Sequence, residues 1–146
     1  MTKQRTLYAS ATAIGAIGLF VCPAPAQALP MVPLAPECGQ YAFTGLTVLN
    51  QSNGYRLEFH ATGPTVDAPV TSFNNRQAVA GRGNVHGGIR GREVTFTVLW
   101  DNGVTGEYSG SVNSNGKARG DTSSPNAGGS ASWNFRTKLE CAGELP

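Results

Sequence analysis

Alternating apolar and polar positions mark four segments of the chain as β-strands. Every second residue is apolar or glycine in "YRLEFHA" at 55–61, and the same pattern runs through 94–100 and 104–112 and, with Thr137 as the one exception, through 131–139. Because successive side chains of a strand point to opposite faces, each segment has one dry face and one wet face. The residues expected on the dry faces are Tyr55, Leu57, Phe59, Ala61, Val94, Phe96, Val98, Trp100, Val104, Gly106, Tyr108, Gly110, Val112, Ala131, Trp133, Phe135 and Leu139.

Asn-Gly pairs separate these segments. "DNG" at 101–103 and "NSNG" at 113–116 supply residues that tolerate the positive φ of a hairpin turn, and "NQSNG" at 50–54 is a longer loop of the same kind. Helical periodicity is absent from Gly39 onward, where glycines are spread too evenly for helices. The chain therefore belongs to the all-β class.

Weaker patterns complete the set of strands. We expect a first strand at 40–49, strand pieces around 77–91 and a short strand at 117–122. The segment 62–75 contains Pro64 and Pro69, which lack a backbone N–H, so it predicts an edge strand or a loop, and 121–130 predicts a loop. The total is about eight strands, which suits a small antiparallel up-and-down barrel.

Two cysteines flank this set of strands. Cys38 precedes the first strand and Cys141 follows the last, and in an up-and-down barrel those two strands are neighbours. A disulfide between them would lock the seam of the barrel and would close a loop of about 100 residues. A β-sandwich that brings both ends together remains the alternative fold.

The first 28 residues have the layout of a secretory signal peptide. Lys3 and Arg5 precede an uncharged apolar run, and "APAQA" places small residues before a cleavage site after Ala28. This predicts a secreted protein with an extended Pro-rich lead-in at 29–37, one domain at 38–141 and a tail at 142–146. In the alternative interpretation, the chain is lipid-anchored at Cys22.

Removal of the leader changes the charge balance. The whole chain has 11 Lys and Arg against 9 Asp and Glu, and two of the basic residues lie in the leader, so the mature chain is formally neutral. Nucleic acid is therefore not the expected partner. The segment 76–92 is locally basic, because Arg76, Arg82, Arg90 and Arg92 occur there without an acidic residue, so an extracellular protein or an anionic polymer could bind this segment.

The expected dry faces interleave aromatic residues with glycines. Alternation of small and large residues can fill a tapered barrel, which predicts a packed core. Alternatively, the inner glycines leave volume unfilled, and the barrel holds an aromatic-lined cavity for a small ligand. The glycines concerned are Gly45, Gly87, Gly106, Gly110 and Gly120.

The run "FTVLW" at 96–100, followed by a hairpin, "YSGSVNSNGK" at 108–117 and "SW" at 132–133, resembles the central part of the avidin and streptavidin family. Members of that family are secreted, calycin-type eight-stranded barrels. The resemblance covers about a third of the mature chain. It implies that Trp100 is a pocket tryptophan and that Tyr108 is an inner aromatic residue beside it.

The chain departs from that family at the ligand-contacting positions. The hydroxyl-bearing residues that contact biotin in the family fall here on Val104 and Gly106, and Phe43 stands where the family has a polar contact. The resemblance therefore extends to the architecture and not to biotin itself. The ligand-binding residues that we expect are Trp100, Tyr108, Tyr41, Phe43 and Trp133.

Motifs for catalysis or metal binding are absent from the sequence. His60 shares a wet strand face with Arg56 and Glu58, and His86 lies in "GNVHGG", a glycine-rich setting that does not hold a base in place. "GRGNVHGG" lacks the third glycine of a dinucleotide fingerprint and no helix follows it. "NQS" at 50–52 fits a glycosylation acceptor at Asn50. We expect no cofactor, no metal and no membrane span.

Two functions of different classes follow from these patterns. The first is a secreted, non-enzymatic barrel that binds a small apolar or aromatic ligand at its mouth. The alternative is a protein-interaction module, such as an inhibitor or a host-surface binder, that acts through the segments 62–75 and 121–130 on a rigid scaffold.

Overall fold

A computed structural model describes residues 37–142 of the chain, and these residues form strands connected by turns, without a helix. The predicted signal peptide 1–28, Cys22, the lead-in up to residue 36 and the last four residues of the tail lie outside this range. The strands are β1 (Tyr41–Gln51), β2 (Arg56–Gly63), β3 (Thr65–Phe73), β4 (Val79–Arg90), β5 (Glu93–Trp100), β6 (Thr105–Val112), β7 (Ala118–Ser123), β8 (Ser130–Phe135) and β9 (Glu140–Cys141).

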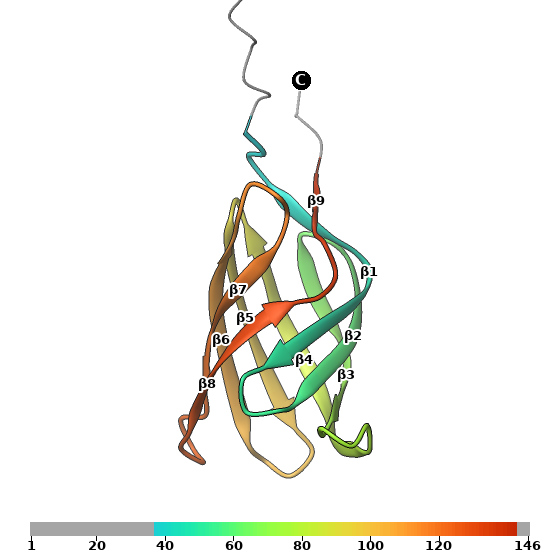
Figure 1. The fold of residues 1–146 in the computed structure, drawn as a ribbon, viewed down its shortest axis with the longest axis vertical. Coiled ribbons are helices and arrows are strands. Elements are labelled where there is room, and N and C mark those ends of the chain that lie inside the picture. Colours follow the sequence, from blue (N-terminus) through green and yellow to red (C-terminus); the bar gives the residue numbers. More distant parts are fainter. Residues whose placement is uncertain (1–36, 143–146) are drawn as a thin grey trace, which may run out of the picture. The chain divides into compact units, whose positions relative to one another are not determined.

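The first eight strands form a closed antiparallel barrel (Figure 1). Each strand pairs with the next along the chain, and β1 pairs with both β2 and β8, so the sheet has no free edge there. The predicted up-and-down barrel is confirmed, and the sandwich alternative is wrong. Chain direction alternates from strand to strand, so the barrel has two distinct ends.

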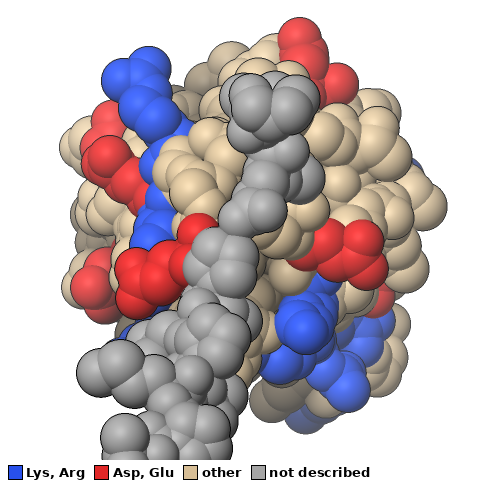
Figure 2. All heavy atoms as spheres, turned by 90° about the horizontal axis from the view of Figure 1, so that it is seen from above, with Lys and Arg blue, Asp and Glu red and all other residues tan. Residues whose placement is uncertain are grey.

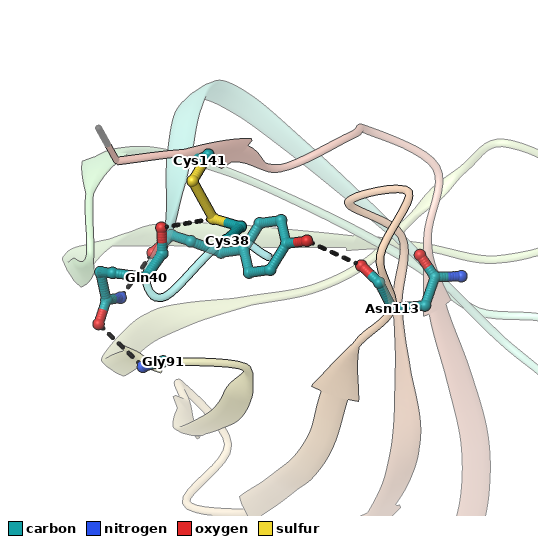
Figure 3. The surroundings of a disulfide bond; sticks show 6 residues. Cys38, Gln40, Gly91, Asn113 and Cys141 are labelled. Atoms are coloured by element: carbon teal, nitrogen blue, oxygen red, sulfur yellow. Dashed lines mark hydrogen bonds between the residues drawn. A yellow bond between two sulfur atoms is a disulfide. The ribbon is translucent and has the colours of Figure 1, made fainter. Parts of the chain in front are cut away.

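The first of these, which we call the closed end, carries the disulfide. Cys38 and Cys141 are bonded, with their Cα atoms 5.6 Å apart (Figure 3). Tyr41 of β1 pairs with Cys141 of β9. Gln40 joins this region to the turn between β4 and β5, because its amide donates to the carbonyl of Ile89 and accepts from the N–H of Gly91. The predicted disulfide and the meeting of the first and last strands are confirmed.

The segment 62–75, predicted as an edge strand or loop, is mostly a regular strand. β3 pairs with β2 on one side and β4 on the other, so it is not an edge. The ladder between β3 and β2 covers only Val70–Phe73. Pro69 lies beyond the end of this ladder, so its missing N–H removes no hydrogen bond between β3 and β2. His86, expected in a flexible setting, lies within the 12-residue strand β4.

The end of the last long strand was also misplaced. β8 ends at Phe135, not at Leu139, and the chain then bends before the short strand β9. Leu139 is buried as predicted, and its N–H donates to the carbonyl of Gly116 in the β6–β7 turn. The loop predicted at 121–130 is shorter, because its ends belong to β7 and β8 and only 124–129 lies outside strands.

The middle of the barrel is a packed aromatic core. Phe59 lies 5.9 Å from Phe96 between ring centroids and 6.4 Å from Phe135, and Trp133 lies 5.1 Å from Phe135. Aromatic residues stand opposite glycines of the neighbouring strand at four places. These pairs are Phe43 with Gly63, Phe96 with Gly87, Trp100 with Gly83, and Trp133 with Gly120.

The inner glycines of the middle do not leave vacant volume. A Cβ atom on Gly120 would lie 1.9 Å from the carbonyl oxygen of Ser109, and one on Gly110 would lie 2.6 Å from the Trp133 ring. Neighbouring backbone and aromatic rings occupy the space that side chains would need. The hypothesis that these glycines leave a cavity is therefore wrong for the middle of the barrel.

Candidate functional site

A cavity of about 450 Å³ lies at the other end of the barrel, which we call the open end. This end carries the β1–β2, β3–β4, β5–β6 and β7–β8 connections, away from the disulfide and the termini of the described chain (Figure 1). All eight barrel strands contribute residues to the lining. The cavity therefore lies along the barrel axis, where the packed core stops short of the mouth.

Trp100 and Tyr108 form an aromatic wall of this cavity. A Cβ on Gly106 would lie 3.5 Å from the indole nitrogen of Trp100 and 3.0 Å from the Tyr108 ring, so glycine there lets the two rings approach. On its other side, the Trp100 ring would lie 3.5 Å from a Cβ on Gly81. Trp100 and Tyr108, which the resemblance places beside each other, both line the cavity, and Tyr55 lines it as well, 43% exposed.

Beside the buried Leu57 and Ala131, the lining carries four polar side chains, Gln51, Ser72, Tyr108 and Thr122, which we call the polar floor. The described residues contain three buried polar or charged side chains, and two of them are Ser72 and Thr122. The Gln51 amide donates to the Tyr108 hydroxyl at 2.7 Å. Hydroxyl and amide groups that line one cavity offer donors and acceptors to a polar group of an occupant.

Tyr108 joins the polar floor to the core. Its ring stacks on Phe96 at 4.6 Å between centroids, and only 3% of the residue is exposed. Burial raises the pKa of Tyr108, and hydrogen bonds with Thr122 and Gln51 oppose that increase. The hydroxyl therefore stays protonated at physiological pH and can donate a hydrogen bond.

The β7–β8 loop, 124–129, forms part of the rim. Asn126 attaches this loop to the β5–β6 turn: its Oδ1 accepts from the N–H of Thr105 and its Nδ2 donates to the carbonyl of Gly103, both at 2.9 Å. Arg82 and Asp101 also line the rim, and the N–H of Asp101 donates to the carbonyl of Arg82. Charged groups are therefore at the rim and absent from the polar floor.

Three residues predicted to bind ligand do not line this cavity. Tyr41 lies at the closed end, where its hydroxyl donates to the carbonyl of Asn113. Phe43 and Trp133 are each 2% exposed in the core, and the Trp133 indole donates to the carbonyl of Asp121. The alternation of apolar and polar residues predicts which side chains point into the barrel. It does not predict how far along the barrel axis each side chain lies.

The direction of each strand indicates how far along the barrel axis its inner residues lie. In an up-and-down barrel, inner residues near the end of odd strands and near the start of even strands share one mouth. Gln51, Ser72 and Thr122 lie late in β1, β3 and β7. None of the three is among the expected ligand-binding residues: 50–54 predicts a loop, 62–75 predicts an edge strand or a loop, and Thr122 falls where the expected strand 117–122 and the expected loop 121–130 overlap.

The four arginines predicted to form a basic surface lie at two ends of the barrel. Arg76 lies in the β3–β4 connection and Arg82 near the start of β4, both toward the open end. Arg90 ends β4, about 26 Å along the strand from Arg82. Arg92 lies at the closed end, 3.8 Å from Glu37. Figure 2, which views the closed end, shows Lys and Arg in two separate groups.

Both histidines lie on the outer surface. His60 is exposed on β2, and the Nδ1 atom of His86 lies 3.1 Å from the Asp67 carboxylate on the neighbouring strand. Within residues 37–142, no three His, Cys, Asp or Glu side chains gather as a metal-binding group. A search of the same residues for a helix long and apolar enough to cross a membrane found none.

The fold defines the class to which the protein belongs, the closed antiparallel up-and-down β-barrels with one disulfide. Comparison of the chain with protein-family models, with curated proteins and with solved structures gave no match.

Proposed function

We propose that this protein is a secreted, non-enzymatic barrel that binds a small ligand with an apolar or aromatic body in the open-end cavity. The observation that carries the proposal is Trp100, whose ring lies between Gly81 and Gly106 on the wall of a cavity of about 450 Å³. Ligand sites of proteins have volumes of about 300–1,000 Å³ and combine aromatic walls with a few polar groups. The disulfide supports an exported protein.

The lining also restricts the chemistry of the ligand. A flat apolar body suits the wall formed by Trp100 and Tyr108. At its inner end, the ligand meets the neutral hydroxyl and amide groups of the polar floor. A neutral hydrogen-bonding group there would satisfy them, whereas a carboxylate would lose its hydration without gaining a cation.

The resemblance to the avidin and streptavidin family supports the position of the site and not the identity of the ligand. Trp100 and Tyr108, the two residues carried over from that family, line the cavity, and so do Val104 and Gly106, which replace its hydroxyl-bearing contacts. Phe43 fills the deeper part of the barrel with a ring. The ligand therefore differs from biotin.

The experiment is isothermal titration calorimetry with three probes that share one flat body: naphthalene, 2-naphthol and 2-naphthoate. We expect 2-naphthol to bind with 1:1 stoichiometry, about fivefold to tenfold more tightly than naphthalene, and 2-naphthoate to bind most weakly. Trp100→Ala should weaken 2-naphthol binding at least about tenfold.

The matched control is Leu99→Ala. Leu99 precedes Trp100 on β5 but points outward and is 50% exposed, so its removal should leave the affinity unchanged. Absence of saturable binding by all three probes would overturn the proposed function. If naphthalene and 2-naphthol bind equally, the cavity takes a ligand but the polar floor does not select it.

A protein partner is the second candidate. Of the two segments predicted to act as loops, 62–75 is largely strand β3, and only 124–129 is an exposed loop on a rigid scaffold. Pull-down of an extracellular protein that persists in Trp100→Ala but is lost when 124–129 is shortened would favour this function.

A further inference from the structure

A second hollow, of about 430 Å³, lies on the outside of the barrel beside the β6–β7 turn. We call it the basic groove. Three of its lining residues are cations that come from three separate segments: Lys117 from the turn, Arg119 from β7, and Arg136 from the chain just after β8. The remaining lining is formed by two amide side chains, Asn113 and Asn134, and by Ala118 and Phe135.

The cations of the basic groove have no acidic partner among residues 37–142. The ion pairs of that range involve Arg56, His86 and Arg92, and none involves a residue of the groove. No acidic residue lines the groove, and the acidic side chain closest along the chain is Asp121, two residues beyond Arg119 on β7. Three cationic residues and no acidic residue therefore line one concave surface, which gives this surface a positive potential.

The framework of the groove is fixed by hydrogen bonds. The Lys117 ammonium donates to the carbonyl of Arg136 at 2.9 Å, which holds the turn against the end of β8. Asn113 accepts from the N–H of Lys117 through its side chain and from the Tyr41 hydroxyl through its carbonyl. Arg119 and Asn134 are directly opposite in the β7–β8 ladder. The three cations thus project from positions that the barrel sets.

We propose that the basic groove binds a sulfate or phosphate group. Such an oxyanion accepts paired hydrogen bonds from the planar guanidinium groups of Arg119 and Arg136, while Lys117 supplies a point charge. The amide groups of Asn113 and Asn134 can donate to the remaining oxygens. This site shares no lining residue with the open-end cavity and does not depend on the proposed function.

The experiment is an NMR titration of the labelled protein with sodium sulfate, at an ionic strength kept constant with sodium chloride. We expect saturable shifts of the backbone amides of Lys117, Arg119 and Asn134. The double variant Arg119→Gln/Arg136→Gln should weaken sulfate binding at least about tenfold, because two charge-assisted contacts are lost.

The matched control is Arg76→Gln/Arg90→Gln, which removes the same charge from two sites away from the groove. It should change sulfate affinity less than about twofold, because exposed charges more than about 10 Å apart are largely screened at ordinary salt. Equal weakening in both double variants, or shifts no larger with sulfate than with chloride, would overturn the proposal.

A further arm distinguishes the source of the anion. Glucose 6-sulfate carries the group as an ester with one negative charge fewer than inorganic sulfate, so binding of the ester as tight as that of sulfate, or tighter, assigns the groove to a sulfated molecule. Weaker binding of the ester assigns it to the free anion. In the groove double variant, 2-naphthol should bind as in the wild type if the two sites are separate, and failure of 2-naphthol in every variant would count against the proposed function alone.

Discussion

Tyr108 is the residue at which the core and the candidate site meet. One side of its ring packs on Phe96, and its hydroxyl belongs to the polar floor. The same burial that makes the ring part of the core disfavours the phenolate and raises its pKa. A neutral donor at this position is therefore a consequence of packing, and it needs no charged neighbour.

Tyr108→Phe should remove a component of alkaline destabilisation. In the unfolded chain, a tyrosine releases its proton near the ordinary pKa of 10.0, whereas folded Tyr108 keeps it to higher pH. The contribution to stability is complete below the ordinary pKa and is lost as pH rises toward the folded one. Urea unfolding from neutral pH to about pH 11 should thus show a shallower decline in the variant.

The control for that measurement is Ser109→Ala, the exposed neighbour on the outer face of β6, which should decline with pH as the wild type does. The same decline in Tyr108→Phe and wild type would contradict the link between burial and the pKa of Tyr108.

At the scale of elements, the alternation of apolar and polar residues predicts most strands, but not which strands pair with each other. β5 and β6 were found because apolar positions alternate on both sides of an Asn-Gly turn, which is local information. β3 was missed as an inner strand because Pro64 and Pro69 argue against one, and its ladders to β2 and β4 are set by non-local pairing. Three of the four residues of the polar floor, Gln51, Ser72 and Thr122, are not predicted for the same reason, since they meet only after the barrel closes.

The β7–β8 loop offers the clearest prediction at this scale. Asn126→Ala removes both hydrogen bonds that attach the loop to the β5–β6 turn, and it leaves the N–H of Thr105 without its acceptor. We expect hydrogen exchange at Thr105 to become about tenfold faster, with a loss of about 1–2 kcal/mol in the free energy of unfolding. Dissociation of 2-naphthol should also become faster, because the loop forms part of the cavity rim.

Asn115→Ala is the control for the loop. Asn115 is exposed in the β6–β7 turn, at the opposite end of the barrel, so this variant should leave both rates unchanged. Unaltered exchange at Thr105 in Asn126→Ala would show that the loop does not depend on this side chain.

At the scale of the whole molecule, the residues that stabilise the fold and the candidate ligand site lie at opposite ends of the barrel. The disulfide, Gln40 and the buried Tyr41 occupy the closed end, and the cavity occupies the open end. Between them lies the aromatic core, in which the rings of Phe59, Phe96 and Phe135 lie 5.9–6.4 Å apart between centroids. Changes at one end should therefore reach the other end only through global unfolding.

The double variant Cys38→Ser/Cys141→Ser tests this separation. The disulfide closes a loop with a sequence separation of 103 residues, so its loss should lower the free energy of unfolding by about 4–5 kcal/mol. The barrel should stay closed, because β1 keeps its ladders to β2 and β8, and far-UV circular dichroism should not change. Calorimetry below the unfolding transition should give wild-type affinity for 2-naphthol, whereas weaker binding by the still folded variant would show that the two ends are coupled.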